Sequence, residues 1–251
     1  MAFTNILPDP NNPITQAGAS TGTSPVNGPG YASVSLKSTM PAQTTRTNSG
    51  SQLVRNVAAH NWDIGIQYNP LTRAEFEPLY TFLLQKKGTV SHFFVQLPQY
   101  NTPQNATWNT YVTSNNMQPK LSSVSSGVDN FIIEDDGANV TYDYTTKGSP
   151  SVGDIFSISD SNNTNHKKVY MITRVETSSG VDNTLAAPAD NSEVRIHFTP
   201  PLHKAITVNT DVDLVFKNVK FRVLNKSKDI SYNLDVNNLY KLSLQLQETQ
   251  P

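Results

Sequence analysis

The chain has 251 residues, a formal net charge of −1 and no cysteine. This length suits one large β-domain or two smaller ones, and the absence of cysteine excludes disulfides, thiolate nucleophiles and zinc–sulfur sites. The near-neutral charge excludes a global basic field that would attract nucleic acid or an anionic membrane. No apolar run reaches membrane length, and no basic segment precedes an apolar core near the first residue. We therefore expect neither a membrane span nor an export signal.

Residues 1–30 are rich in Pro, Gly, Asn, Ser and Thr and show no hydrophobic period. Such a segment cannot build a core of its own, which predicts an extended N-terminal arm that is either disordered alone or ordered against a neighbouring molecule. Residues 31–36 alternate weakly in polarity and lead, through a Thr-rich stretch, to Leu53–Trp62. We therefore expect a long hairpin across residues 31–68.

The segment from Trp62 to Pro98 is the most regular part of the chain and predicts a strand, a helix and a second strand. Apolar and polar residues first alternate up to Tyr68, which is the period of a half-buried strand. The helix is expected over residues 72–87, between a capping box at its start and a glycine stop at Gly88. Its apolar residues recur at helical spacing and form one stripe. The core residues expected from this segment are Trp62, Ile64, Phe76, Leu79 and Leu83.

Beyond Pro98 the composition changes to a stretch that is dense in Asn, Thr and Gln. Short strand candidates then follow, separated by turns that contain Gly, Asn, Asp or Pro. We interpret residues 99–190 as an inserted small antiparallel β-barrel or sandwich with its own core. The strands expected in it are Phe131–Glu134, Val140–Tyr144, Asp154–Ser159 and Lys168–Val175.

The alternating pattern resumes at Asn191, and we assign residues 31–98 and 191–251 to one β-domain. Its last strand, Tyr240–Gln247, alternates like Trp62–Tyr68, so the two strands are expected to share one core face. Leu242 and Leu244 therefore join the predicted core. The other strands expected here are Val194–Phe198, Val212–Phe216 and Val219–Leu224.

No constellation of catalytic residues stands out in the sequence. The five histidines never stand at the H-x-H or H-E-x-x-H spacing of zinc sites, and the chain lacks a G-x-S-x-G elbow and a phosphate-binding loop. The acidic turn Glu134–Asp136 lacks the spacing of a calcium loop and is interpreted as solvated. We expect no catalytic residue, no metal site and no cofactor.

The aromatic residues in the polar part of the insertion allow two interpretations. Trp108 and Tyr111 could stack on a sugar or another partner, whereas burial as core anchors of the insertion is the more common role for such residues. The basic residues between Lys217 and Lys228 likewise indicate either a nucleic-acid contact or, more commonly, a solvated face or a protein interface.

Four sequence features occur in a characteristic order. The first is the strand–helix–strand unit, whose helix reads LTRAEFEPLYTFLLQKKG. The second is the insertion with Val152–Ile155 and Lys168–Ile172, and the third is Phe198–Leu202. The fourth is the closing pair of strands, VKFRVLN and LYKLSLQLQE. In this order they resemble the distal tail and baseplate-ring proteins of tailed bacteriophages, over roughly residues 31–251.

This resemblance implies a mainly β (α+β) fold: a tail-tube-like β-sandwich or split barrel, flanked by one helix and carrying the inserted β-domain. It implies a non-enzymatic subunit that forms a homohexameric ring around the tail channel. The ring would join the tail tube protein to hub, fibre or receptor-binding proteins, with no membrane partner. The genome would pass through it without sequence-specific binding. The expected location is the virion, at the tail tip or baseplate, after assembly in the host cytoplasm.

Two other functions remain open from the sequence alone. In the first, the insertion is a carbohydrate- or receptor-binding module of the tail, with contacts from Trp108, Tyr111, Tyr142 and Tyr144. The other is an enzyme such as a glycan hydrolase, whose carboxylate pair depends on distances in the folded chain and cannot be found from spacing.

Overall fold

The computed structural model describes residues 5–13, 27–56, 59–121, 123–135, 142–160, 164, 166–179, 188, 190–207 and 212–250. The chain divides into two compact units. The first contains Met1–Val95 and Arg222–Thr249, and the second contains Gln96–Phe221 and Gln250–Pro251. The second unit is thus inserted between the two parts of the first.

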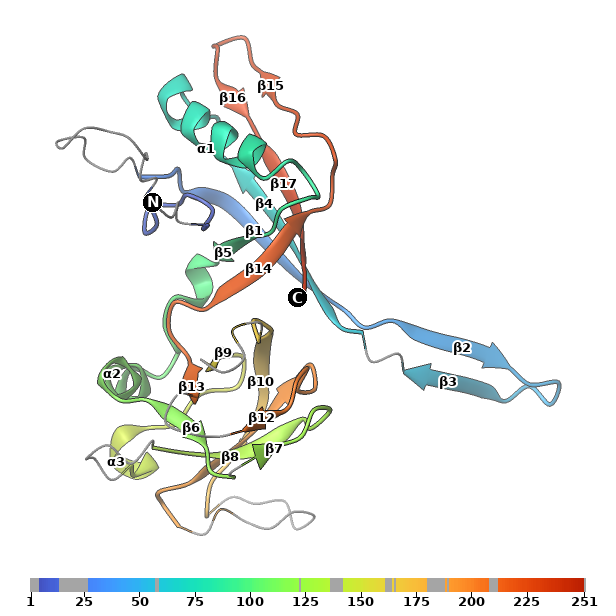
Figure 1. The fold of residues 1–251 in the computed structure, drawn as a ribbon, viewed down its shortest axis with the longest axis vertical. Coiled ribbons are helices and arrows are strands. Elements are labelled where there is room, and N and C mark those ends of the chain that lie inside the picture. Colours follow the sequence, from blue (N-terminus) through green and yellow to red (C-terminus); the bar gives the residue numbers. More distant parts are fainter. Residues whose placement is uncertain are drawn as a thin grey trace. The chain divides into compact units, whose positions relative to one another are not determined.

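The first unit is built from strands and one described helix (Figure 1). Its strands are β1 (Tyr31–Thr39), β2 (Ala42–Arg46), β3 (Gln52–Asn56), β4 (Asn61–Tyr68), β5 (Phe93–Gln96), β14 (Lys220–Asn225), β15 (Asn233–Leu234), β16 (Tyr240–Lys241) and β17 (Ser243–Glu248). The helix is α1 (Arg73–Gln85).

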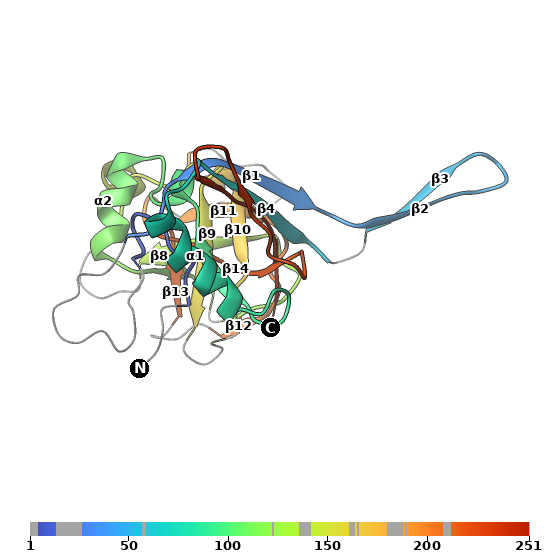
Figure 2. The same ribbon diagram turned by 90° about the horizontal axis from the view of Figure 1, so that it is seen from above.

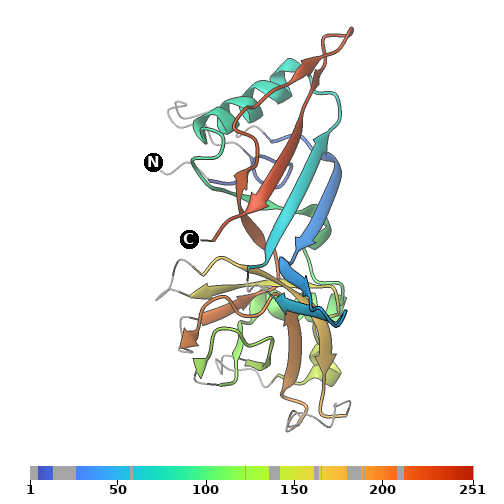
Figure 3. The same cartoon turned by 90° about the vertical axis from the view of Figure 1, so that its right-hand side faces the viewer.

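Five strands of this unit form one sheet in the order β1-β4-β17-β14-β5. Figure 3 shows β1 in blue, β4 in cyan and β17 in red lying side by side. The expected match between the Trp62 strand and the last strand is a direct antiparallel pair, in which Leu244 lies opposite Ile66 and Leu246 opposite Ile64. Because side chains at paired positions point to the same face of a sheet, these residues share one core. The expected hairpin across residues 31–68 is confirmed by the β1–β4 and β2–β3 pairs.

Helix α1 begins as its sequence predicts. The Glu75 carboxylate accepts hydrogen bonds from the backbone N–H of Thr72 at 2.9 Å and from the Thr72 hydroxyl at 2.7 Å. The helix buries its apolar stripe, and Phe82 meets Phe93 of β5 edge-on with ring centroids 5.6 Å apart. Every residue expected in the core of this unit is buried: Trp62, Ile64, Phe76, Leu79, Leu83, Leu242 and Leu244.

The second unit contains two short α-helices, α2 (Ala106–Ser114) and α3 (Tyr144–Lys147), and the 3-10 turn η1 (Pro98–Tyr100) among its described residues. Its strands are β6 (Met117–Pro119), β7 (Ser123–Val124), β8 (Asn130–Asp135), β9 (Ile155–Asp160), β10 (Val169–Glu176), β11 (Val194–Thr199), β12 (Ile206–Thr207) and β13 (Val212–Val215).

Six of these strands form a sheet in the order β13-β9-β10-β11-β8-β6, and its two end strands approach each other, so the sheet nearly closes into a barrel. Aromatic rings fill it: Phe156 lies within 5.6 Å of Tyr170, Phe198 and Phe216, measured between ring centroids. The mainly β fold class with a second small β-unit is thereby confirmed.

The boundaries of the insertion differ from those expected. Residues 99–190 were predicted as the insertion, but β11 and β13 also belong to its sheet, where β11 pairs with β10 and β13 pairs with β9. Their alternating pattern is common to every half-buried strand and does not say which sheet a strand joins. The expected strand Val140–Tyr144 lies partly outside the described residues, and Tyr144 begins helix α3 instead.

Candidate assembly surface

The two edges of the first unit's sheet are different. The β5 edge is covered by the N-terminal arm: Leu7 N–H donates to the Phe94 carbonyl at 2.7 Å, and Phe94 N–H donates to the Asn5 carbonyl at 2.7 Å. Ile6 and Phe94 form a parallel bridge, and the Leu7 side chain is fully buried. An edge strand with free backbone groups invites pairing with another chain. The arm removes that possibility at β5.

The arm was expected either to be disordered alone or to become ordered against a neighbour, but its described residues pack against their own chain. Asp9 anchors a turn in which its carboxylate accepts from Asn11 N–H at 2.7 Å and from Asn12 N–H at 2.9 Å. Gly28 returns to this turn and donates to the Asp9 carbonyl at 3.2 Å. A Cβ on Gly28 would lie 2.3 Å from the Pro8 carbonyl carbon, so the approach requires glycine. Residues 1–4 and 14–26 lie outside the described residues.

We expect Leu7→Ala to lower the free energy of unfolding by about 2–3 kcal/mol, because a fully buried leucine leaves a cavity when truncated. Urea unfolding of the full chain measures the loss. The matched control is Leu84→Ala, at an exposed leucine of the same unit, which should change the stability by less than about 0.5 kcal/mol. Equal effects of the two substitutions would mean that the arm is not docked in solution.

The opposite edge of the sheet is β1, which continues into the β2–β3 ribbon. Figures 1 and 2 show this ribbon extending away from the ends of β1 and β4. Hydrogen bonds hold its base, where the Thr39 hydroxyl donates to the Asp63 carboxylate at 3.1 Å and Ser38 Oγ lies 2.9 Å from His60 Nε2. Its tip is a turn in which Gly50 has φ +85° and donates to the Thr47 carbonyl.

The ribbon exposes apolar and basic side chains together. The side chains of β2, and those of β3 from Gln52 to Arg55, are all exposed. Leu53 is 55% exposed, Val54 62% and Met40, which precedes β2, 53%. Residues 31–60 include Lys37, Arg46 and Arg55 and no acidic residue. An isolated two-stranded ribbon is at best marginally stable in water, so this combination is typical of a surface that a partner covers.

The structure separates the two interpretations of Trp108 and Tyr111. The polar stretch that holds them forms helix α2, capped by the Asn105 side chain, which accepts from the N–H groups of Thr107 and Trp108. Trp108 is fully buried and packs on Tyr142 and Phe216. It is a core anchor and cannot stack on a ligand. The capping asparagine, followed by aromatic residues three apart, is the sequence signal that identifies the helix.

His197 also has a structural role. Its Nε2 lies 3.2 Å from Glu176 Oε1, and Arg195 Nε lies 3.6 Å from Glu176 Oε2. Arg174 forms a further ion pair with this buried carboxylate. A carboxylate buried without partners is costly, and this cluster supplies partners to Glu176 from both β10 and its paired strand β11.

The described residues contain no group of three or more His, Asp or Glu side chains placed to hold a metal ion. Within the same ranges, no helix combines the length and apolar character needed to cross a membrane. The exposed side chains of the ribbon make it the candidate contact surface among the described residues.

Two comparisons with known proteins agree on the family. Residues 7–100 match the family model described as distal tail protein pb9, A domain, N-terminal. The chain is also 27% identical over 224 residues to distal tail protein pb9 of Escherichia phage T5, across 88% of this chain and 93% of that protein. The range matched by the family model, residues 7–100, runs from the docked arm through β1–β5 and includes the exposed ribbon. These findings confirm the resemblance inferred from the sequence.

Proposed function

We propose that this chain, a distal tail protein of a bacteriophage and so a component of the virion, closes into a homohexameric ring around the tail channel. The ring joins the tail tube protein on one side to hub, fibre or receptor-binding proteins on the other. The genome passes through it without sequence-specific binding, and the ring forms in the host cytoplasm before the tail is complete. Its role is structural rather than catalytic.

The exposed β2–β3 ribbon is the observation that carries this proposal. No other described strand pairs with the edges of the ribbon. No described part of the chain covers its apolar and basic side chains. A second copy of the chain supplies a partner at the ring interface, and because the ring closes, every copy is covered in the same way. The net charge of −1 for the whole chain leaves the remainder acidic, which favours contact with a ribbon carrying the two basic residues Arg46 and Arg55.

The asymmetry of the sheet edges supports the same proposal. The arm closes the β5 edge, whereas β1 remains the outer strand of the sheet and leads directly into the ribbon. A ring requires head-to-tail contacts, in which β1 and the ribbon of one copy meet a different surface of the next copy. We therefore place the contact between copies at β1 and the ribbon.

Light scattering of the purified full chain across a concentration series tests the proposal. We expect a species of six protomers for the natural sequence. Val54→Asp should shift assembly to concentrations at least about tenfold higher, equivalent to about 1.4 kcal/mol per contact, because it places a charge in a covered apolar surface.

The matched control is Val90→Asp, an exposed valine of the same unit outside the ribbon, which should assemble like the natural chain. Electron microscopy of the assembled species then shows whether it is a closed ring. Unchanged assembly of Val54→Asp would contradict the role of the ribbon. A chain that stays monomeric at every concentration would contradict spontaneous ring closure.

A further inference from the structure

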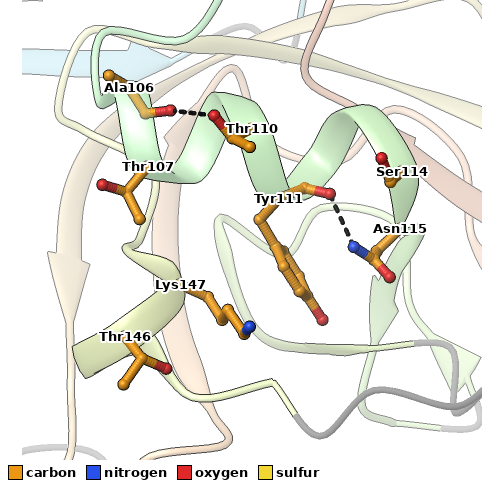
Figure 4. Close-up of a pocket in the computed structure, with 8 residues that line it drawn as sticks. All are labelled: Ala106, Thr107, Thr110, Tyr111, Ser114, Asn115, Thr146 and Lys147. Carbon is orange, nitrogen blue, oxygen red and sulfur yellow. Dashed lines mark hydrogen bonds between the residues drawn. The ribbon is translucent and has the colours of Figure 1, made fainter.

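A groove of about 570 Å³ lies between helices α2 and α3 of the second unit (Figure 4). None of its lining residues belongs to the ribbon or to an edge strand of either large sheet. Most of its lining consists of hydroxyl and amide side chains, and one residue is charged. The lining residues are Ala106, Thr107, Thr110, Tyr111, Ser114, Asn115, Thr146 and Lys147.

The two helices that form the groove are held in fixed positions. The Asn105 side chain caps α2 and also donates to the Ser149 carbonyl beyond α3 at 3.2 Å. Gly148 ends α3 with φ +74°, and a Cβ there would lie 3.0 Å from the Trp108 backbone nitrogen. The Tyr142 hydroxyl donates to the Gly148 carbonyl at 2.9 Å. The groove is therefore preformed, which lowers the entropic cost of binding a ligand.

Several polar groups in the groove have no partner among the residues that the structure describes. They are the hydroxyls of Thr107 and Ser114, the Oδ1 atom of Asn115 and the ammonium group of Lys147. In contrast, the Thr110 and Thr146 hydroxyls donate to the backbone carbonyls of Ala106 and Asp143, as Asn115 Nδ2 does to that of Tyr111. These groups can donate to or accept from a ligand without breaking a hydrogen bond to another described residue.

Tyr111 provides a rigid aromatic surface beside these groups. Its hydroxyl donates to the Asp135 carboxylate, and its ring packs against Trp108 and Tyr142 with centroid distances of 6.0 and 5.4 Å. Figure 4 shows the Tyr111 ring and the Lys147 side chain extending into the same space between the helices. The ring itself is almost fully buried, so only its margin reaches the groove.

We propose that this groove binds an acidic carbohydrate, with Lys147 pairing with its anionic group. Thr107, Ser114 and Asn115 bond its hydroxyls. Sugars present the alternating donors and acceptors that these side chains match, and the margin of an aromatic ring packs against their C–H groups. A single cation is too few for a nucleic-acid strand, which needs a series of basic side chains along its phosphates. Glycan contact then involves exposed groups of α2 and α3 and not the buried Trp108.

The test uses the full chain on an array of bacterial oligosaccharides that includes neutral, uronic-acid and phosphorylated sugars. We expect binding to acidic members, confirmed by calorimetry with the best of them. Lys147→Ala and Thr107→Val should each weaken that binding at least tenfold. The control Lys204→Ala, at another lysine of the second unit, should bind like the natural chain.

Binding to neutral sugars alone, or binding that survives both groove substitutions, would overturn the assignment, and so would an array with no bound glycan. Binding to a 15-nucleotide single strand in preference to any glycan would overturn it as well. Light scattering of Lys147→Ala and Thr107→Val tests ring formation separately from glycan binding. Because both substitutions leave the ribbon intact, both variants should assemble like the natural chain.

Discussion

Trp108→Ala should lower the free energy of unfolding of the second unit by about 3–5 kcal/mol, the usual cost of emptying a large buried aromatic site. The indole is fully buried, and its ring centroid lies 5.7 Å from that of Tyr142 and 5.4 Å from that of Phe216. Trp108 also packs on Tyr111 of α2. The substitution therefore removes a packing partner from three aromatic rings at once.

Hydrogen–deuterium exchange of the full chain measures this loss within each unit. Peptides from β9 and β10 should lose protection, while peptides from β4 and β17 keep it, because the latter pack around the other tryptophan, Trp62. The control Leu121→Ala truncates an exposed leucine of the same unit and should leave both sets of peptides unchanged. A loss below about 1 kcal/mol for Trp108→Ala would mean that the core of the second unit tolerates the cavity.

Acidification should also destabilise the second unit, through His166. Its ring is fully buried, and its Nε2 atom lies 2.8 Å from the Tyr170 hydroxyl. That hydroxyl also accepts the backbone N–H of His203 at 3.0 Å, so the Tyr170 oxygen bonds both groups. The other ring nitrogen has no hydrogen-bond partner within the described residues. The site is built for a neutral imidazole.

The pKa of His166 is lowered from 6.5 to about 4, first by burial and then by the charge of His203. Lys204 and Lys167 add to this lowering, and Asp160 opposes it. Above pH 6.5 the imidazole is neutral in both the folded and the unfolded chain, and the site has no effect on stability. Between pH 6.5 and 4 only the unfolded chain takes up the proton. Stability is therefore lost as the pH falls through this range, by about 3 kcal/mol in total.

Urea unfolding at pH 7, 6, 5 and 4 measures this dependence. Carboxylates titrate over the same range, so the informative quantity is the difference in slope between the natural chain and His166→Gln, which should be shallower. The control His60→Gln, at a partly exposed histidine of the first unit, should keep the natural slope. Identical slopes for all three proteins would show that His166 is not the titrating group.

The proposed ring contact and the proposed carbohydrate groove lie in different units of the chain. The first unit carries the ribbon and the open sheet edge proposed to join copies, and the family match of residues 7–100 falls there. The groove that we assign to carbohydrate lies wholly in the second unit. Substitutions in one unit can therefore test one function while leaving the other measurable.

Sequence periodicity predicted the helix and the strands of the first unit well because these patterns depend on local interactions. The alternation from Trp62 to Tyr68 and the helical stripe through Phe76 and Leu83 reflect which side of each element faces the core. The Thr72–Glu75 cap acts within one helical turn. None of these features depends on a distant residue, so the sequence alone determines them. The resemblance to distal tail proteins rested on the same strand–helix–strand unit, and the comparisons confirmed it.

Only the tertiary structure decided which strands share a sheet and which polar groups remain free. β11 and β13 alternate like the strands of the first unit, yet they pair with β10 and β9, since backbone pairing carries no residue code. The arm, predicted as an extended polar segment, docks because Leu7 is buried beside β5 by residues that are distant from it in the chain. Trp108 is buried and Val54 exposed for the same reason: burial is a property of the packed surroundings, which are distant in the chain.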